Sequence, residues 1–500
     1  MAGIVYLVGA GPGDPGLLTL RGAELLRRAD VVVYDHLAFP GLLDMVRPDA
    51  RIIYVGKEGA DHTLSQEAIN DLLVREGAAG NSVVRLKGGD PYIFGRGGEE
   101  ALRLAERGVA FEVVPGVSST CAAAAYAGIP LTHRDLSSQA VLITGHERPD
   151  REDSAHSWKA LAAIGTLVAV MGRERLPEIC RALLEAGKDP ATPAALVEWG
   201  TTDRQRTAAA TLSDLPSLAD SLGIRPPALF VCGKVVGLRE RLAWFERRPL
   251  WGRTVSVTRT RSQAGRLSAA LRELGARVEE RPVIRIEEID PNPELDRALA
   301  GLSRFAWVAF TSPNGAGIFM RALFARGLDA RALAGARIAV IGPGTAEALR
   351  PWGLVPDLVP RSFVAEGLLE AFRGAEPGPL LLARARKARD VLPEGLASLG
   401  FAVELCPLYE TGHPSPDPAW DPASSDLTTI TSASCAEGLA ALVPEGDRAR
   451  VRTASIGPVA SSRARELGFT VAVESPAASI PALVGAMEAY FRAGPAPGGA

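Results

Sequence analysis

Short apolar segments rich in β-branched residues alternate along this chain with longer amphipathic segments. Ile4 to Val8, Val31 to Tyr34 and Val83 to Leu86 have the composition of buried strands, whereas the apolar residues of Leu17 to Arg28 recur at helical spacing. This alternation is typical of βαβ units, so it predicts an α/β fold with largely parallel sheets. At 500 residues, the chain is long enough for about three domains.

One domain boundary is visible in the sequence. A helical segment, Leu238 to Phe245, ends before Pro249, and a new strand is expected to begin at Thr254. We therefore expect one part of the chain to cover residues 1–246 and a second part to cover residues 250–493.

The composition excludes several classes of protein. Lys and Arg number 55 against 58 Asp and Glu, which gives a net charge of −3, and 47% of the residues are hydrophobic. A chain so close to neutrality lacks the basic character of a dedicated nucleic-acid binder, and its apolar segments are shorter than the about 18 residues that span a membrane. Its five widely separated cysteines form no metal-ligand pattern, which predicts reduced thiols, no metal site and a cytoplasmic location.

The carboxy-terminal half contains a weak internal repeat. Three matched segments recur in the same order, 125, 120 and 115 positions apart. They imply two similar α/β units of about 120 residues, with a ligand in the cleft between them. Alternatively, the similarity is the general one of strands that end in Gly or Ser before a helix. The matches are Leu274, Gly275, Val278, Glu279 and Pro282 with Leu399, Gly400, Val403, Glu404 and Pro407, Phe310-Thr311-Ser312 with Ile430-Thr431-Ser432, and Ile341-Gly342-Pro343 with Ile456-Gly457-Pro458.

Two glycine-rich segments follow predicted strands in the amino-terminal half. Gly11 to Gly16 fits the spacing GxGxxG, and Asp35 follows the next strand about 20 residues later, which taken alone predicts a dinucleotide site. The two prolines of this segment fit that interpretation poorly, because proline has no N–H group to bind a phosphate. The second segment has five glycines between Gly88 and Gly98 and an acidic Asp90, which favours a ligand-binding loop over a bulged connection.

The amino-terminal half carries seven motifs: Val5 to Asp14, Val33-Tyr34-Asp35, Gly56-Lys57, Val83 to Glu100, Val114 to Ser119, Ala127 to Arg134 and Gly200-Thr201-Thr202. Together they resemble the uroporphyrinogen-III C-methyltransferases over about residues 3–245. The resemblance implies an S-adenosylmethionine-dependent enzyme with two α/β domains that are not of the Rossmann type and that divide near residues 115–135. It therefore replaces the dinucleotide interpretation, and it also implies a homodimer formed through this half.

The same resemblance implies the residues of a methyl-transfer site. Asp35 would accept a proton and Lys57 would donate one, since the macrocycle must lose a proton after a pyrrole carbon attacks the sulfonium methyl. Without the resemblance, Asp35 would be interpreted as a helix cap, Lys57 as a solvated side chain and Thr166 to Met171 as a buried strand. The implied cofactor contacts are Pro12, Gly88, Gly89, Asp90, Ile93, Ser118, Ser119, Met171 and Gly200.

The substrate of that family carries many carboxylates, so its site needs cationic donors. Four basic residues beside the motifs are candidates for this role. They are Arg85, Lys87, Arg96 and Arg134.

The carboxy-terminal half carries four further motifs: Val257-Thr258-Arg259 with Gln263, Phe310 to Gly315, Ala339 to Ala346 and Leu408 to Thr411. They resemble uroporphyrinogen-III synthase over about residues 250–490. The resemblance implies closure of a linear hydroxymethyl tetrapyrrole, with loss of water, inversion of the last ring and no cofactor. It also implies two lobes joined by a two-strand ladder, lobe 1 from about 250–284 and 410–493 and lobe 2 from about 287–405. One motif departs from the family, because Ser479-Ile480 stands where Thr-Ile after an aromatic residue is usual.

Tyr409 matches the best placed tyrosine of the synthase family and is the candidate for assisting hydroxyl departure, although a tyrosine at a strand end is more often a packing residue.

Polar residues at other strand ends open helices, whose free N–H groups bind anions, although the same residues also serve as ordinary caps. The basic stretch Arg384 to Arg389 is either a further carboxylate site or a solvated helix face. The candidate substrate contacts are Thr311, Ser312, Asn314, Thr345 and Ser432.

The two resemblances imply successive reactions, because the product of the synthase is the substrate of the methyltransferase. We expect a bifunctional enzyme that converts hydroxymethylbilane into uroporphyrinogen III and methylates it at C2 and C7 to give precorrin-2. The alternatives are a methyltransferase of another corrin intermediate fused to a non-catalytic tetrapyrrole-sensing module, and a dinucleotide oxidoreductase. The motifs leave open whether the product serves sirohaem or cobalamin formation.

Overall fold

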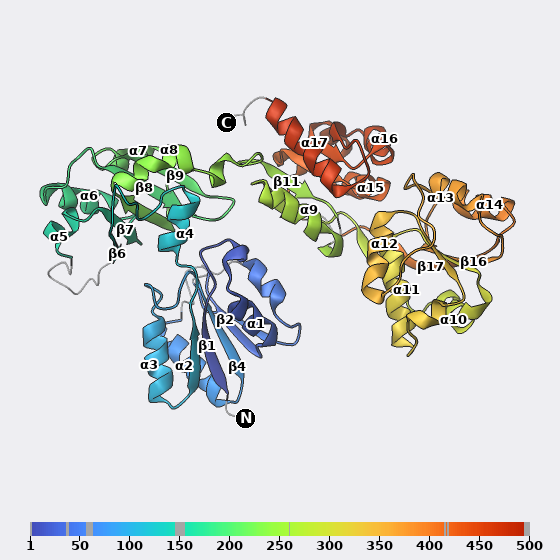
Figure 1. Cartoon of the computed structure of the whole chain (residues 1–500), viewed down its shortest axis with the longest axis horizontal. Helices are drawn as coiled ribbons and strands as arrows, with labels where there is room; N and C mark the ends of the chain where they lie inside the picture. The colour runs from blue at the N-terminus through green and yellow to red at the C-terminus, as the bar shows by residue number, and fades with distance from the viewer. Residues whose placement is uncertain are drawn as a thin grey trace. The chain divides into compact units, whose positions relative to one another are not determined.

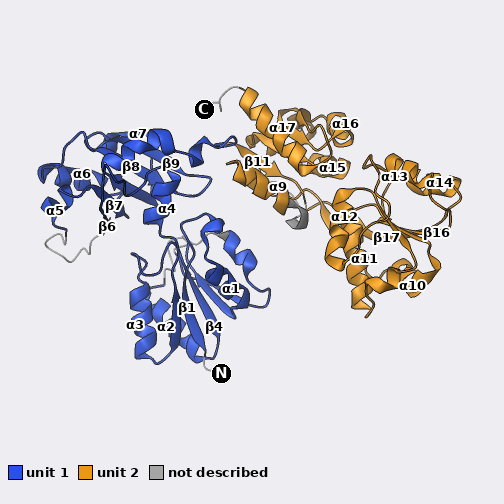
Figure 2. Cartoon of the chain, viewed as in Figure 1, with its two compact units in different colours: residues 1–252 blue, residues 253–500 orange. Residues whose placement is uncertain are grey.

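A computed structural model of the chain describes residues 3–36, 40–56, 64–145, 156–259, 261–414, 417 and 420–494, with the backbone alone at residues 40 and 261–264. The chain divides into two compact units, residues 1–252 (unit 1) and residues 253–500 (unit 2) (Figure 2). Among the helices that the structure describes, none is long and apolar enough to cross a membrane. All five cysteines are free thiols, four of them buried and Cys121 exposed.

The first sheet of unit 1 has five parallel strands covered by helices on both faces (Figure 1). On one face Leu7 packs with Leu73 and Leu104, and on the other face Val8 packs with Leu26. Because both faces are buried, β1 and β2 are almost continuous apolar runs, as the sequence predicts for a parallel sheet. The strand order is β3 (Arg51–Tyr54), β2 (Val31–Tyr34), β4 (Ser82–Lys87), β1 (Ile4–Gly9) and β5 (Ala110–Val114), and the helices are α1 (Leu20–Arg28), α2 (Gln66–Ala78) and α3 (Gly97–Glu106).

The second sheet of unit 1 is mixed, which differs from the largely parallel sheets expected. β10 is antiparallel to both β7 and β8, and β8 is antiparallel to β9, whereas β6 and β7 are parallel. The β8–β9 pair is antiparallel because only Trp199 to Gln205 (the 199–205 turn) join the two strands, too few residues for the crossover of a parallel pair. The strand order is β6 (Ala140–Thr144), β7 (Thr166–Val170), β10 (Ala228–Cys232), β8 (Pro193–Glu198) and β9 (Arg206–Thr211).

Helix α4 (Ser119–Tyr126) leads from the first sheet to the second. Its Ala123 and Ala124 pack with Val168 and Val197 of the second sheet. Helix α4 therefore begins just after the last strand of the first sheet, and its body packs against the second sheet. The remaining helices of this unit are α5 (Trp158–Ala162), α6 (Leu176–Glu185), α7 (Leu215–Ser221) and α8 (Arg239–Leu242).

Unit 2 contains two sheets, and each forms one lobe. Lobe 1 has a parallel sheet in the order β12 (Arg277–Glu280), β11 (Thr254–Val257), β18 (Leu427–Ile430), β19 (Arg452–Ser455) and β20 (Thr470–Glu474). Lobe 2 has the order β13 (Arg285–Glu288), β17 (Ala402–Gly412), β16 (Pro379–Ala385), β14 (Trp307–Phe310) and β15 (Arg337–Val340), with only β13 antiparallel among these pairs. The helices are α9 (Arg261–Glu273), α10 (Pro293–Ala300), α11 (Pro313–Ala325), α12 (Pro343–Leu349), α13 (Ala365–Phe372), α14 (Val391–Ser398), α15 (Ala433–Leu442), α16 (Pro458–Glu466) and α17 (Ile480–Ala493).

The sequence repeat is divided between the two lobes. The matched segments lie at β12 and β17, at β14 and β18, and at β15 and β19, and these pairs hold equivalent places in the two sheets. The first repeat therefore supplies β11 and β12 to lobe 1 but β14 and β15 to lobe 2. The second repeat supplies β16 and β17 to lobe 2 and β18 and β19 to lobe 1. The chain returns to lobe 1 only after Gly412, later than expected, because the end of β17 pairs with β13.

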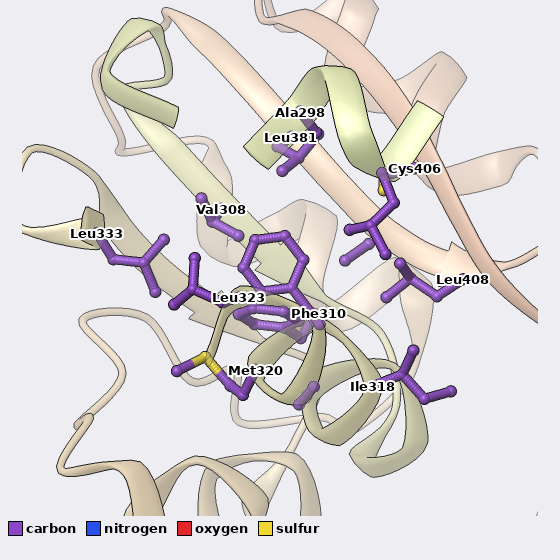
Figure 3. Close-up of a cluster of buried hydrophobic side chains, with 14 of the residues drawn as sticks. Ala298, Val308, Phe310, Ile318, Met320, Leu323, Leu333, Leu381, Cys406 and Leu408 are labelled. Carbon is purple, nitrogen blue, oxygen red and sulfur yellow. The ribbon is translucent and has the colours of Figure 1, made fainter. Parts of the chain in front are cut away.

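One buried cluster of lobe 2 lies where α10 and α11 pack against its sheet (Figure 3), and a second one contains residues of α13 and α14. Phe310 of β14 and Phe319 of α11 meet edge to face, with ring centroids 5.4 Å apart. Met320 and Leu323 fill the space beside them. The side chain of Tyr409, the candidate residue on β17, belongs to this buried cluster.

Candidate functional site

Three loops meet at the carboxyl edge of the first sheet of unit 1. Gly11 and Gly89 exchange two backbone hydrogen bonds, of 3.2 and 2.7 Å between nitrogen and oxygen, which join the loops after β1 and β4. The Oδ2 atom of Asp90 accepts a hydrogen bond of 3.0 Å from the N–H group of Gly116, which adds the loop after β5. The loops that carry Pro12, Gly88 to Ile93 and Ser118 are thereby brought together.

Asp90 and Ser118 are both used to shape these loops. The Oδ1 atom of Asp90 accepts hydrogen bonds from the backbone N–H groups of Tyr92 and Ile93, at 2.8 and 3.1 Å. Ser118 caps α4, where its side chain accepts a bond from the N–H group of Thr120, and Ser119 is the first helical residue. The carboxylate and the hydroxyl thus hold the backbone that surrounds the predicted cofactor residues.

All non-glycine residues of the described chain with positive φ lie beside predicted cofactor residues. Their φ angles range from 46° to 75°, a region that costs an ordinary side chain conformational energy. Such outliers cluster at ligand sites, where the surrounding structure holds them in place. Phe94 and Arg96 follow Ile93, Met171 is itself one of the set, and Trp199 and Thr201 flank Gly200. This strain could not be predicted from the sequence, since none of these residue types favours positive φ.

The 199–205 turn is joined to the first glycine loop. The N–H group of Asp14 donates to Oγ1 of Thr201 at 3.1 Å, and the hydroxyl of Tyr126 donates to Oδ2 of Asp14 at 2.7 Å. Burial, together with the Asp14 carboxylate, raises the pKa of Tyr126. A Cβ atom at Gly13, whose φ is +146°, would lie 2.6 Å from Cγ2 of Thr202, so only glycine allows this approach. Gly200 therefore lies next to the loops of the first sheet, whereas Met171 is exposed at the end of β7.

Asp35, the predicted proton acceptor, is bound by a buried arginine. It follows β2, its side chain is 23% exposed, and its Oδ2 atom accepts a hydrogen bond of 3.0 Å from Nη2 of Arg85. Arg85 and Lys87 are almost fully buried on β4, and both bind Oε1 of the fully buried Glu100, at 3.3 and 2.7 Å. Burial, with the nearby Arg85 charge, lowers the pKa of Lys87.

This arrangement changes the interpretation of two candidate substrate residues. Arg85 and Lys87 compensate Glu100 inside the protein, where an unpaired charge would be costly, so neither presents an exposed cation. Arg85 lies between Glu100 and Asp35, which makes it suited to orienting the Asp35 carboxylate. The sequence alone did not reveal Glu100 as their partner, because it lies on α3 rather than on the strand.

The other basic candidates differ in their surroundings. Arg96 is exposed and pairs with Glu99 at 2.7 Å, a hydrogen bond that raises the pKa of the guanidinium. Arg134 is exposed. Lys57, the predicted proton donor, lies outside the described residues.

In unit 2, Tyr409 lies against the start of α11. Its side chain is 6% exposed, and its hydroxyl is 2.8 Å from Oγ of Ser312, which also accepts a hydrogen bond of 3.0 Å from the N–H group of Gly315. Ser312 is therefore a helix cap as well as the partner of the tyrosine. Burial raises the pKa of Tyr409.

The remaining candidates of unit 2 lie at helix starts in both lobes. Thr311 precedes α11 and donates to the carbonyl oxygen of Ala383, and Asn314 lies in the first turn of that helix. Thr345 is 2% exposed within α12. Ser432 caps α15 in lobe 1.

Three of the four basic residues in the stretch 384–389 pair with carboxylates, and the stretch is not a helix face. It connects β16 to α14, which begins at Val391. Three arginines bind acidic partners, with nitrogen–oxygen distances of 2.9 to 3.4 Å. The pairs are Arg384 with Asp390, Arg386 with Glu410 and Arg389 with Glu366.

Within the described residues, no group of three His, Cys, Asp or Glu side chains is arranged to hold a metal ion. A cavity of about 460 Å³ lies in lobe 2, lined by Glu294, Arg297, Arg304 and Glu404 among others, and it contains none of the predicted residues.

Comparison with known proteins assigns each unit separately. Residues 4–216 match the family model described as tetrapyrrole (corrin/porphyrin) methylases, and residues 265–485 match the model of uroporphyrinogen-III synthase HemD. The porphyrin biosynthesis protein HemD of Ruminiclostridium josui is 42% identical over 415 residues, which cover 82% of both chains. The siroheme synthase of Chromobacterium violaceum is 53% identical over 247 residues, 49% of this chain, and the chain spans about half the length of that relative, 52%.

A solved structure is similar to unit 1. It is the uroporphyrin-III C-methyl transferase of Thermus thermophilus in complex with S-adenyl homocysteine, 43% identical in sequence, with a TM-score of 0.41. The match covers 47% of this chain and 100% of that one.

Proposed function

The chain belongs to the family of tetrapyrrole methylases of the uroporphyrinogen-III C-methyltransferase type fused to uroporphyrinogen-III synthase, and from this membership we propose two successive reactions. Unit 2 closes hydroxymethylbilane into uroporphyrinogen III with inversion of the last ring and loss of water. Unit 1 then methylates this macrocycle at C2 and C7 to give precorrin-2. Both steps fall within tetrapyrrole biosynthesis, to which both families belong.

The cofactor proposed for unit 1 is S-adenosylmethionine, and the observation that supports the proposal is the set of residues with positive φ in the loops that carry the predicted cofactor residues. Bound there, it supplies the methyl group. Glycine leaves the backbone accessible to a ligand, and at Gly89 it also permits a φ of +70°, which other residues rarely adopt. Exposed apolar side chains, Ile93 and Met171, suit an adenosine and a thioether chain. The residues proposed to hold the cofactor are Pro12, Gly88, Gly89, Asp90, Ile93, Ser118, Ser119, Met171 and Gly200.

Asp35 is the proposed proton acceptor. A carboxylate at the open edge of the sheet suits this role, because the methylated macrocycle must lose a ring proton as its double bonds rearrange. Arg85 fixes the orientation of this carboxylate through the hydrogen bond to Oδ2. Lys57 is the proposed proton donor.

In unit 2, positioning of the flexible substrate is proposed to contribute more than any single acid. Tyr409 remains the proposed group that assists departure of the hydroxyl, and its raised pKa keeps the phenol protonated and able to donate. The substrate carboxylates would be bound at strand ends and helix starts, by Thr311, Ser312, Asn314, Thr345 and Ser432, and in unit 1 by Arg96 and Arg134.

The test is an anaerobic incubation of the purified full-length protein with hydroxymethylbilane, with and without S-adenosylmethionine, followed by product analysis by mass and isomer. We expect uroporphyrinogen III without the cofactor and a dimethylated product with it. Only the type I isomer, which forms spontaneously, would show that unit 2 lacks synthase activity. Type III without added methyl groups would show that unit 1 acts on another corrin intermediate.

A further inference from the structure

A series of buried and partly buried hydrogen bonds links the 199–205 turn to the end of unit 1. The N–H group of Thr201 donates to Oε1 of Gln205 at 2.8 Å, and Nε2 of Gln205 donates to Oε1 of Glu246 at 2.7 Å. Gln205 is 3% exposed, and Glu246 also accepts a bond of 2.6 Å from Oγ1 of Thr207. The amide oxygen of Gln205 thus accepts a hydrogen bond from the turn, and its amide nitrogen donates one to Glu246.

Glu246 comes from the far end of unit 1. It lies in a 3-10 helix, Phe245–Arg247, shortly before unit 2 begins. Its other carboxylate oxygen forms an ion pair with Arg239, which also donates to the backbone oxygen of Ala127. The carboxylate is therefore fixed on both oxygens, so it is a rigid anchor for Gln205.

The turn needs such an anchor because its conformation is unfavourable. Trp199 and Thr201 have φ angles of 46° and 75°, and Thr201 is β-branched, which makes this region especially costly. Its N–H group is also buried and would be destabilising without a partner. On the opposite side, Oγ1 of Thr201 binds the N–H group of Asp14, while Gly200 lies so close to α4 that a Cβ would be 2.3 Å from Cβ of Ala123.

We propose that Gln205 and Glu246 are positioning residues for the cofactor site of unit 1. They hold Gly200 and Thr201 in the strained conformation that completes the site beside the first glycine loop. This inference rests on the proposed function, because it assigns the turn to S-adenosylmethionine. It predicts an effect on cofactor affinity, and therefore on the KM for S-adenosylmethionine, rather than on the rate of methyl transfer once the cofactor is bound.

The test uses the full-length protein and S-adenosylhomocysteine as the titrant in calorimetry. Gln205→Leu and Gln205→Glu should each weaken binding by about tenfold or more, since a buried donor or acceptor loses its partner. The exchange Gln205→Glu with Glu246→Gln should restore part of the affinity lost in Gln205→Glu, because the carboxylate at 205 can accept from both Thr201 and the amide at 246, whereas Arg239 keeps only a neutral amide oxygen as its partner. Gln139→Leu, at an exposed position of the same unit, is the matched control.

Two further readouts separate positioning from loss of structure. Hydrogen exchange of the peptide that covers residues 199–205 should be faster in the Gln205→Leu variant without ligand, while the cyclisation activity of unit 2 stays unchanged. Wild-type affinity in Gln205→Leu, or an exchanged double variant no better than its single variants, would overturn the inference. Failure of the unmodified protein to bind S-adenosylhomocysteine would instead refute the proposed function of unit 1, and this inference with it.

Discussion

The hydroxyl of Tyr409 lies 2.8 Å from Oγ of Ser312, and the same oxygen caps α11. Because one serine serves both groups, substitutions can separate the proposed chemistry from the support of the helix. Tyr409→Phe removes the phenol but leaves the cap, so we expect the cyclisation rate to fall by about tenfold or more with little loss of stability. Activity and melting temperature measured on one preparation check this, and an unchanged rate would assign Tyr409 to packing alone.

Ser312→Ala should have the complementary effect. It removes the cap and leaves the buried tyrosine hydroxyl without its partner, so unfolding should become easier by about 1–3 kcal/mol. Thermal unfolding of unit 2 measures this change. A stability loss in Tyr409→Phe equal to that in Ser312→Ala would contradict the separation of roles.

The free energy of unfolding at alkaline pH provides a further test of the same tyrosine. Burial raises the pKa of Tyr409 above its ordinary value of 10.0. Below pH 10 the phenol is protonated in both the folded and the unfolded chain. Above pH 10 the unfolded chain loses this proton first, so the folded state loses stability as the pH rises. We expect this loss to be shallower in Tyr409→Phe when unfolding by urea is compared at pH 9 and above pH 10. Identical slopes in the two proteins would show that the phenol is not shielded.

Asp35 and Arg85 should give distinguishable defects in unit 1. Asp35→Asn keeps the shape but removes the base, so methyl transfer should slow by about 10²-fold or more while S-adenosylhomocysteine binds as before. Arg85→Met should slow methyl transfer and also destabilise the unit by about 1–3 kcal/mol, because Asp35 loses its ion pair and Glu100 keeps only Lys87 as a cationic partner. Single-turnover kinetics and unfolding check both, and a fully active Asp35→Asn variant would exclude this residue as the proton acceptor.

Gly200 offers a test of the close approach between α4 and the 199–205 turn. A methyl group there would overlap Ala123, so Gly200→Ala should lower cofactor affinity and destabilise the unit by about 1–3 kcal/mol. Gly237→Ala is the matched control, since Gly237 is exposed, nothing lies within 4 Å of its Cβ position and its φ is not in the left-handed region, so the variant should be neutral or slightly stabilising. Equal affinity in the two variants would contradict the crowded packing.

The sequence predicts the elements of this fold better than the details of its sites. The strands expected at Ile4 to Val8 and Val31 to Tyr34, and the strand start at Thr254, are confirmed because apolar β-branched runs depend on local composition. The antiparallel strands of the second sheet were missed, since pairing direction depends on tertiary structure.

The candidate site shows the same limit. The glycine loops could be located because glycine marks a close approach of the backbone. The positive φ of Thr201 and the pairing of Lys87 with Glu100 could not, because both depend on how the elements pack in three dimensions, which local composition does not specify. The roles of the predicted site residues stay predictions until the variants are measured.

The division of the repeat between two lobes also sets an order for synthesis on the ribosome. Lobe 2 is built from one continuous stretch, β13 to β17, and can complete its sheet as soon as that stretch has emerged. β11 and β12 emerge earlier, but β11 also pairs with β18, which is translated only after the whole of lobe 2. Lobe 1 therefore closes last and through contacts distant in sequence, which makes it the slower lobe to fold and the one whose strand edges stay exposed for longest.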